Sequence, residues 1–323
     1  MIIFVRKTED TAMMKYPIGV QSFEQIRNDG YVYVDKTDLV YRLVKGGKIY
    51  FLSRPRRFGK SLLVSTIENY FLGRHELFKG LAIGALEKDW LQYPVFHIDF
   101  NSSNFTEGGV LDRKIEATVA GWEEVYGRPA RDLDVGGRFA EVLRKAHEAT
   151  GRRCVVLIDE YDKPLLDVMD TDYTIEVGGQ RRPLEDWNRE VLRGFYSVFK
   201  AADNDLQFVL LTGVTKFAQI SVFSGFNQAR DISMSERYEA LCGITQEELE
   251  RYFAEPVGAM AAKMGITRDG VLQRLKEQYD GYHFSVAMRD IYNPFSLLSA
   301  FDKLRIDSYW FTTGSPEYLM RLM

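Results

Sequence analysis

The chain has 323 residues, of which 46% are hydrophobic and 27% are charged, a composition typical of a globular protein with a substantial core. Its formal net charge of -4 argues against a surface built mainly for nucleic acid, although a local basic groove stays open. No apolar run approaches the roughly 18 residues of a membrane span, and Cys154 and Cys242 have no metal-ligand spacing. We therefore expect a cytoplasmic protein with no membrane contact.

Predicted strands and helices alternate through most of the chain. Residues 1–15 are expected to be a flexible extension, and 16–44 alternate turn residues with short apolar stretches. Strands are predicted at 49–53, 94–100, 154–158 and 206–212, and helices at 60–72, 112–126, 137–149 and 184–201. The run 154–158 is continuously apolar, as in a parallel strand that is covered on both faces. The pattern predicts an α/β three-layer sandwich around a central, mainly parallel sheet, with a main domain over 16–233.

After Ile232 the residue pattern changes and predicts mostly helices. Thr245 and Glu248 form a capping box, and Asn293 and Pro294 supply the start of a later helix. We expect residues 234–323 to form a smaller, mostly helical lid. The final stretch "SPEYLMRLM" begins a helix without a stop signal, which suggests that a further domain follows in a longer protein.

A glycine-lysine-serine triplet lies between the predicted strand 49–53 and the helix that follows it. A phosphate-binding loop reads G-x-x-x-x-G-K-[ST], and Gly59, Lys60 and Ser61 match its end, whereas Arg54 stands where the first glycine is required. A bare G-K-[ST] occurs by accident in on the order of one chain in six of this length. The flanking strand and helix favour a real site, because loop N–H groups and a helix N-terminus must converge on the phosphates. The predicted nucleotide-binding residues are Arg54, Pro55, Arg56, Arg57, Phe58, Gly59, Lys60, Ser61 and Leu62.

A phosphate-binding loop lacks a second metal ligand and a group that activates water, and a pair of carboxylates about 100 residues downstream can supply both. Asp159 ends an apolar strand and is expected to hold Mg²⁺ together with the Ser61 hydroxyl, while Glu160 polarises the attacking water. Thr212, at the end of strand 206–212, lies where a sensor of the γ-phosphate is expected. We assign catalytic roles to Glu160, Lys60 and Thr212.

Several residues near this site keep two interpretations. Pro55, with its fixed φ, would replace the missing glycine by a different turn. Arg56 and Arg57 would either contact phosphate or a partner segment, or be solvated loop charges. Asp162 fits a helix-capping or supporting role better than a catalytic one.

The stretches "SRPRRFGKSLL", "VVLIDEYDKPL", "YVYVDKT", "LLTGVTKF" and "NPFSLL" together resemble the bacterial AAA-ATPase-like family. The resemblance runs from about Tyr16 to the end of the chain, and the arginine-bearing loop is itself the family's version of the motif. It implies a P-loop ATPase of the additional-strand, catalytic-glutamate class that uses ATP and Mg²⁺. It also implies a C-terminal PD-(D/E)XK nuclease-like domain, which would lie beyond Met323 and bring a nucleic-acid partner.

Three functions follow from these observations. The first is an ATPase that uses nucleotide-driven closure of the lid as a switch. The second is a nucleotide-sensing interaction module with little or no hydrolysis. The third is a nucleic-acid-directed motor, which the acidic charge balance weakens for this stretch of chain. The protein partner is not encoded in any recognisable pattern.

Overall fold

The computed structural model describes residues 14–215 and 229–309. Its central sheet has five strands in the order β2-β3-β6-β1-β7, and all four strand pairs are parallel. The strands are β1 (Ile49–Ser53), β2 (Val95–Asp99), β3 (Cys154–Asp159), β6 (Leu206–Gly213) and β7 (Arg230–Asp231). β6 lies between β1 and β3, so it is the additional strand of the predicted class, and the predicted fold class is confirmed.

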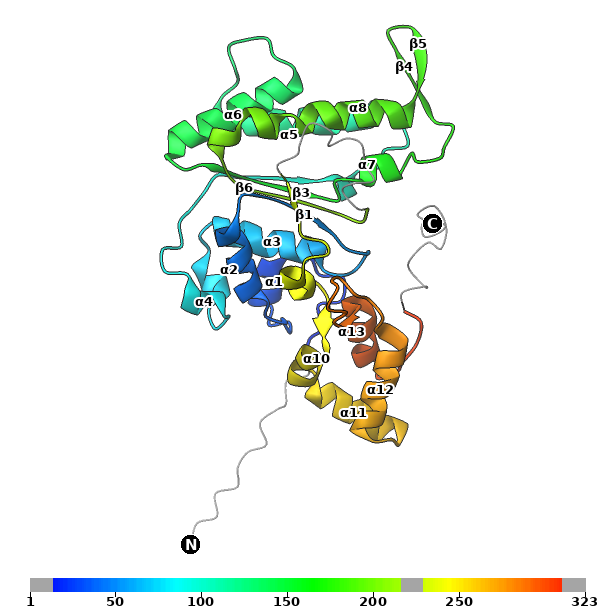
Figure 1. The fold of residues 1–323 in the computed structure, drawn as a ribbon. Helices are drawn as coiled ribbons and strands as arrows, with labels where there is room; N and C mark the ends of the chain where they lie inside the picture. The colour runs from blue at the N-terminus through cyan, green and yellow to red at the C-terminus, as the bar shows by residue number, and fades with distance from the viewer. Residues whose placement is uncertain (1–13, 216–228, 310–323) are drawn as a thin grey trace.

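Helices cover both faces of the sheet (Figure 1). One face carries α5 (Val110–Tyr126), α6 (Val135–Thr150), α7 (Lys163–Leu166), α8 (Leu184–Tyr196) and α9 (Val198–Ala201). The other face carries α1 (Phe23–Asn28), α2 (Thr37–Gly46), α3 (Lys60–Phe71) and α4 (Ile83–Leu86). The five residues of β1 and the six of β3 are buried throughout, as expected for strands covered on both sides.

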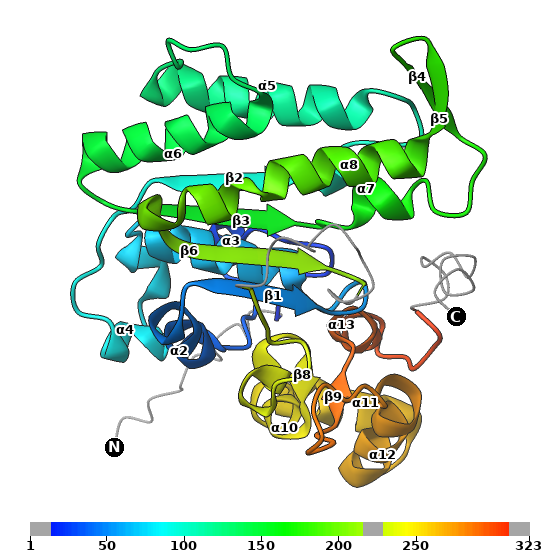
Figure 2. The same ribbon diagram turned by 45° about the horizontal axis from the view of Figure 1, so that its top comes forward.

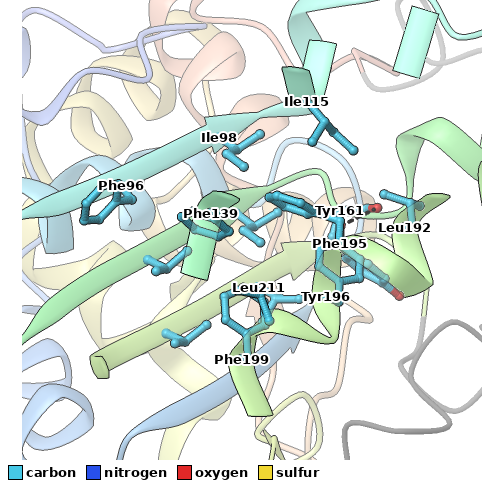
Figure 3. Packing of buried hydrophobic residues seen from close by; sticks show 14 of the residues in the cluster. Phe96, Ile98, Ile115, Phe139, Tyr161, Leu192, Phe195, Tyr196, Phe199 and Leu211 are labelled. Carbon is cyan, nitrogen blue, oxygen red and sulfur yellow. Dashed lines mark hydrogen bonds between the residues drawn. The ribbon is translucent and has the colours of Figure 1, made fainter. Parts of the chain in front are cut away.

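Each face of the sheet has its own hydrophobic core. Figure 3 shows the core under α8, where the Tyr161 ring lies among Phe195, Tyr196 and Leu211. Tyr161 also meets the ring of Phe51 edge-on, with centroids 5.2 Å apart. Because Tyr161 follows the predicted carboxylate pair directly, this packing fixes the backbone that carries both carboxylates.

A third core gathers the helices of the C-terminal part. Its helices are α10 (Gln246–Tyr252), α11 (Ala254–Met264), α12 (Arg268–Tyr279) and α13 (Pro294–Lys303). The short strands β8 (Ile244–Thr245) and β9 (Ile291–Tyr292) pair beside them. Tyr16 packs against Phe253 and Phe301 of this core, with centroids 6.4 and 6.2 Å apart. Residues near the N-terminus therefore pack with the C-terminal helices, an arrangement that the sequence did not indicate.

Some local structure differs from the sequence prediction. The helix predicted over 184–201 is broken at Ser197 into α8 and α9. A hairpin of β4 (Thr174–Val177) and β5 (Gln180–Pro183) follows α7 and was not predicted; its turn is Gly178-Gly179, both with positive φ. Three short 3-10 helices, η1 (His75–Phe78), η2 (Phe100–Ser102) and η3 (Asp203–Asp205), connect larger elements, and η6 (Glu236–Leu241) precedes β8. Residues 1–13 of the predicted extension and the predicted helix at 315–323 lie outside the described residues.

Candidate nucleotide site

The carboxyl ends of the central strands meet at one edge of the sheet (Figure 2). The register pairs Ser53 at the end of β1 with Gly213 at the end of β6, and Asp99 with Asp159 at the ends of β2 and β3. Residues that follow parallel strands at this edge are the usual ligand-binding residues of an open α/β sheet. The loop at 54–59, the carboxylate pair and Thr212 all lie here, although they are far apart in the sequence.

The loop between β1 and α3 presents a lysine at the first position of a helix. Gly59 has φ +89°, a left-handed conformation that glycine adopts without steric cost, and α3 begins at Lys60. The first N–H groups of α3 have no acceptor within the helix and face the loop. Lys60 is 4% exposed, and its ammonium donates to the carbonyls of Arg54 and Pro55 at 3.2 and 3.5 Å. This is a buried cation at a helix N-terminus, the chemistry that recognises phosphate.

Glu160 faces that lysine. Its Oε1 lies 3.4 Å from Lys60 Nζ, and its backbone has φ +52°, a strained conformation for a residue with a side chain. Burial raises the pKa of the Glu160 carboxyl, against the opposing effect of Lys60. A strained, half-buried carboxylate with a raised pKa beside a lysine of this kind has the properties of a general base.

Asp159 and Thr212 form a buried pair beneath the site. Asp159 is 3% exposed and Thr212 is fully buried. The Thr212 hydroxyl donates to Asp159 Oδ1, which also accepts the Glu160 N–H at 3.1 Å. Thr212 therefore contacts the predicted metal ligand, and it does not line the cavity described next.

A cavity of about 320 Å³ opens over the loop. Lys60, Ser61 and Glu160 line its floor, together with Arg56, Arg57, Gly59 and Leu62. Its opposite wall was missed by the sequence analysis and comprises Pro17, Ile18, Gly19, Val20, Gln21, Pro294, Phe295 and Leu298. The stretch "NPFSLL" supplies three residues of this wall, but nothing in it indicated a role in the site, because the wall is assembled only when the N-terminal segment packs on α13.

A second, mainly apolar cavity of about 110 Å³ adjoins the first. The two share the walls Pro17, Gly59, Leu62, Pro294 and Leu298. Phe58 and Lys36 line the second cavity, and Lys36 Nζ is 2.6 Å from Glu248, the residue that completes the capping box of α10. The pair of cavities offers one charged chamber and one apolar chamber side by side.

Two predicted loop residues line neither cavity. Arg54 is 1% exposed, and its guanidinium bonds backbone carbonyls on the side of η6. Pro55 also lines neither cavity. Arg57, in contrast, lines the larger cavity and stacks over the ring of Phe295 at 4.1 Å. For Arg54, the structure thus places the side chain in the protein interior and not at the predicted nucleotide position.

Asp162 supports the end of β6. Its Oδ2 accepts the N–H groups of Val214 and Thr215 at 2.9 and 2.6 Å and the Thr215 hydroxyl at 2.6 Å. It makes no side-chain cap on α7, so of its two predicted roles the supporting one agrees with these contacts. Burial raises the pKa of the Asp162 carboxyl, in spite of the three donors.

The donor set fits a nucleotide-bound Mg²⁺ better than a metal held by protein ligands alone. Within the described residues, no three His, Cys, Asp or Glu side chains gather in a way that could hold a metal ion. A magnesium ion of this kind needs only one or two protein oxygens, because phosphates and water complete its shell. Ser61 lines the cavity, and no hydrogen bond among the described residues uses Asp159 Oδ2.

A family model described as "Predicted AAA-ATPase" matches residues 17–223, which include the loop, the carboxylate pair and β6. The chain belongs to this AAA-ATPase-like family. Membership supports an ATP-binding ATPase at the level of the family, and with it the use of nucleotide.

Two further comparisons place this member of the family. A protein of Azotobacter chroococcum mcd 1, described as "Uncharacterized protein in vnfD 5'region", is 39% identical over 311 residues. The match covers 96% of this chain and 56% of that protein, so this chain spans little more than half the length of its relative. The structure of the Aeropyrum pernix ORC1 protein in complex with DNA matches over 88% of this chain and 62% of that chain, with 13% identity and a TM-score of 0.33. Within the described residues, no helix is both long and apolar enough to cross a membrane.

Proposed function

We propose that this protein binds ATP with Mg²⁺ in the two joined cavities and hydrolyses it. The observation that carries the proposal is the Lys60–Glu160 pair, 3.4 Å apart, at the N-terminus of α3 and on the floor of the larger cavity. A phosphate cradle and a water-activating carboxylate are the two groups that ATP hydrolysis requires from a protein. The apolar cavity that adjoins them suits the base of the nucleotide.

The roles of individual residues follow from their positions. The N–H groups at the start of α3 and the Lys60 ammonium would bind the β- and γ-phosphates. Ser61 and Asp159 would hold Mg²⁺, which neutralises charge on the phosphate oxygens. Thr212 would orient Asp159 through its hydroxyl. This role differs from the direct contact with the γ-phosphate that we expected from the sequence.

Lys60 and Glu160 also suggest how the site rests without nucleotide. Lys60 bonds two loop carbonyls and Glu160, and an incoming phosphate would compete for the same ammonium. Glu160 would then be released to bind water. The same contact favours the second candidate function, a nucleotide sensor with little turnover, in which Glu160 stays paired with Lys60.

Nucleotide-driven closure would act between the α3 side and the α13 side of the larger cavity. Pro294, Phe295 and Leu298 reach its wall from α13, so a bound nucleotide touches both parts at once. Such a ligand favours the closed arrangement by the difference in its affinity for the two states. Coupling to a nuclease-like domain in longer relatives remains part of the proposal, and salt-dependent stimulation of hydrolysis by DNA in a longer protein would support it.

The decisive experiment measures thermal stability with and without Mg·ATP. At 100 times Kd, ATP should stabilise the fold by about 2.7 kcal/mol, and Lys60→Ala should abolish the shift. Lys79→Ala, which changes an exposed lysine away from both cavities, is the matched control and should keep it. Absence of a shift in the wild-type protein at millimolar ATP would contradict the proposed function.

A further inference from the structure

Arg54 is an unusual residue for a protein interior. It is 1% exposed, and its Nε is buried without a hydrogen-bond partner among the described residues. No carboxylate of the described residues forms an ion pair with it. Burial lowers the pKa of Arg54 to about 10, because it outweighs Asp231 and Glu239, which favour the charged form. Burying this cation without an ion-pair partner is costly, so its retention needs an explanation beyond the packing of a loop.

Backbone carbonyls and one aromatic ring hold the guanidinium. Nη1 donates to the carbonyls of Ser53 and Ser233 at 2.9 and 2.7 Å, and Nη2 approaches those of Tyr238 and Glu239 at 3.3 and 3.5 Å. The guanidinium carbon also lies 4.0 Å from the centre of a phenylalanine ring, that of residue 284. The fork thus reaches η6, the segment just before it, and the stretch that leads into β9.

The backbone of the same residue belongs to the nucleotide loop. Its N–H donates to the carbonyl of Gly213 at 3.1 Å, and its own carbonyl accepts from Lys60 Nζ at 3.2 Å. Arg54 is therefore bonded at once to the end of β6, to the lysine of the proposed phosphate cradle, and to the segments that lead into the C-terminal helices. The glycine usual at this position has no side chain and makes no such connection.

Phe58, in the same loop, makes a second connection between the loop and the segments that lead into the C-terminal helices. Its ring lies 4.7 Å from that of Tyr282 and 5.4 Å from that of Phe284, and its carbonyl accepts the N–H of Gly243 at 3.1 Å. A β-carbon on Gly243 would lie 2.2 Å from the Ile291 side chain, so the backbone approaches β9 too closely here for any residue with a side chain. The loop and the base of the C-terminal helices are thus packed as one unit.

We propose that Arg54 is a positioning residue that couples the nucleotide loop to residues 233–241 and 282–285. The proposal rests on the proposed function, because the signal it transmits is nucleotide binding at Lys60. When phosphate draws Lys60 away from the Arg54 carbonyl, the loop rearranges, and the guanidinium passes that change to η6 and Phe284. Coupling between sites requires an element that both sites bias, and this arginine touches both.

The test is amide hydrogen exchange of wild type and variants, with and without a non-hydrolysable ATP analogue and Mg²⁺. In wild type, the analogue should slow exchange both at the start of α3 and in residues 233–241. In Arg54→Met the slowing at α3 should remain, whereas the slowing at 233–241 should fall by about tenfold, within the usual range of coupling between two sites. Arg54→Lys, which keeps the charge but loses the fork, should fall between the two.

Two further variants keep the result interpretable. Arg138→Met removes another largely buried arginine, one that binds Glu123 and Glu116 on the far face of the sheet, and should leave the coupled slowing unchanged. Phe284→Leu removes the ring that stacks on the guanidinium and leaves Arg54 itself in place. It should weaken the slowing at 233–241, and it provides a test of the coupling if Arg54→Met fails to fold.

The outcomes separate the two proposals. If wild type shows no slowing at the start of α3, the proposed function itself is wrong. If wild type shows it, and Arg54→Met and Phe284→Leu both retain full slowing at 233–241, the function stands and the coupling role of Arg54 is overturned.

Discussion

Gly213, at the end of β6, is a sharp test of how tightly the site is packed. A β-carbon at this position would lie 2.4 Å from the Tyr161 ring and 2.7 Å from Asp162 Oδ1. Ordinary contacts start near 3.4 Å, so the Tyr161 ring must move by about 1 Å and Asp162 by about 0.7 Å. Tyr161 cannot move freely, because its ring packs on Phe51 and its hydroxyl contacts Thr215.

Overpacking of this kind costs about 1–3 kcal/mol, and we place Gly213→Ala near the upper end. At about 2–4 °C per kcal/mol, the unfolding midpoint should fall by roughly 4–10 °C. Because Asp162 supports the end of β6, stabilisation by Mg·ATP should also shrink. Differential scanning fluorimetry with and without nucleotide measures both effects.

Gly194→Ala is the matched control. Gly194 lies in the exposed part of α8 with nothing within 4 Å of its ideal β-carbon, so the same substitution should stabilise the helix by about 0.5–1 kcal/mol. The reasoning is refuted if the melting temperature of Gly213→Ala lies within about 1 °C of that of the wild type while Gly194→Ala behaves as expected.

Three further predictions concern carboxylates whose pKa is shifted. Glu160→Gln should keep ATP binding and lose turnover in a phosphate-release assay, with the exposed Glu124→Gln as control. As the pH is lowered, the wild-type rate should begin to fall at a pH above the usual range of a carboxyl, because burial raises the pKa of Glu160 and a general base must be deprotonated. Equal rates in wild type and Glu160→Gln would reassign the base. Asp162→Ala should destabilise by about 3 kcal/mol in urea unfolding, since three donors lose their acceptor, and Asp162→Asn by clearly less; equal losses would show that the acceptor oxygen is unimportant. Burial opposes ionisation of Glu87, but hydrogen bonds from Lys45 and Tyr70 lower its pKa to about 2. Its contribution to stability is present above the unfolded pKa near 4.5 and is lost as the pH falls towards 2, so Glu87→Gln should flatten the stability profile in that window; an unchanged slope would contradict the assignment.

Much of the fold could be predicted because its signals are local. The stretches 49–53, 94–100, 154–158 and 206–212 each became a strand within a residue or two. For β1, β3 and β6 the signal is a nearly continuous apolar run, because these strands are buried along almost their whole length. The strand β2 instead alternates buried and half-buried residues. The short helices α1 and α2 and the β4–β5 hairpin were not predicted. Their turn residues and short apolar stretches fit several local structures equally well.

The parallel sheet also explains why the site could be anticipated in part. Residues after the ends of neighbouring parallel strands must meet, so the loop before Lys60, the pair Asp159-Glu160 and Thr212 share one edge as expected. The functions assigned to these residues stay predictions until nucleotide binding is measured.

The sequence by itself determined which residues carry charge to the sheet edge and which helix N-terminus faces them, because strand, loop and helix are contiguous in the chain. Only the tertiary structure decided where Arg54 points and what closes the cavity. The guanidinium turns inward because carbonyls of Ser233 and Tyr238, about 180 residues away, offer it acceptors. The cavity wall joins residues 17–21 to α13 from opposite ends of the chain. Such contacts depend on long-range packing, and no local pattern of residues encodes them.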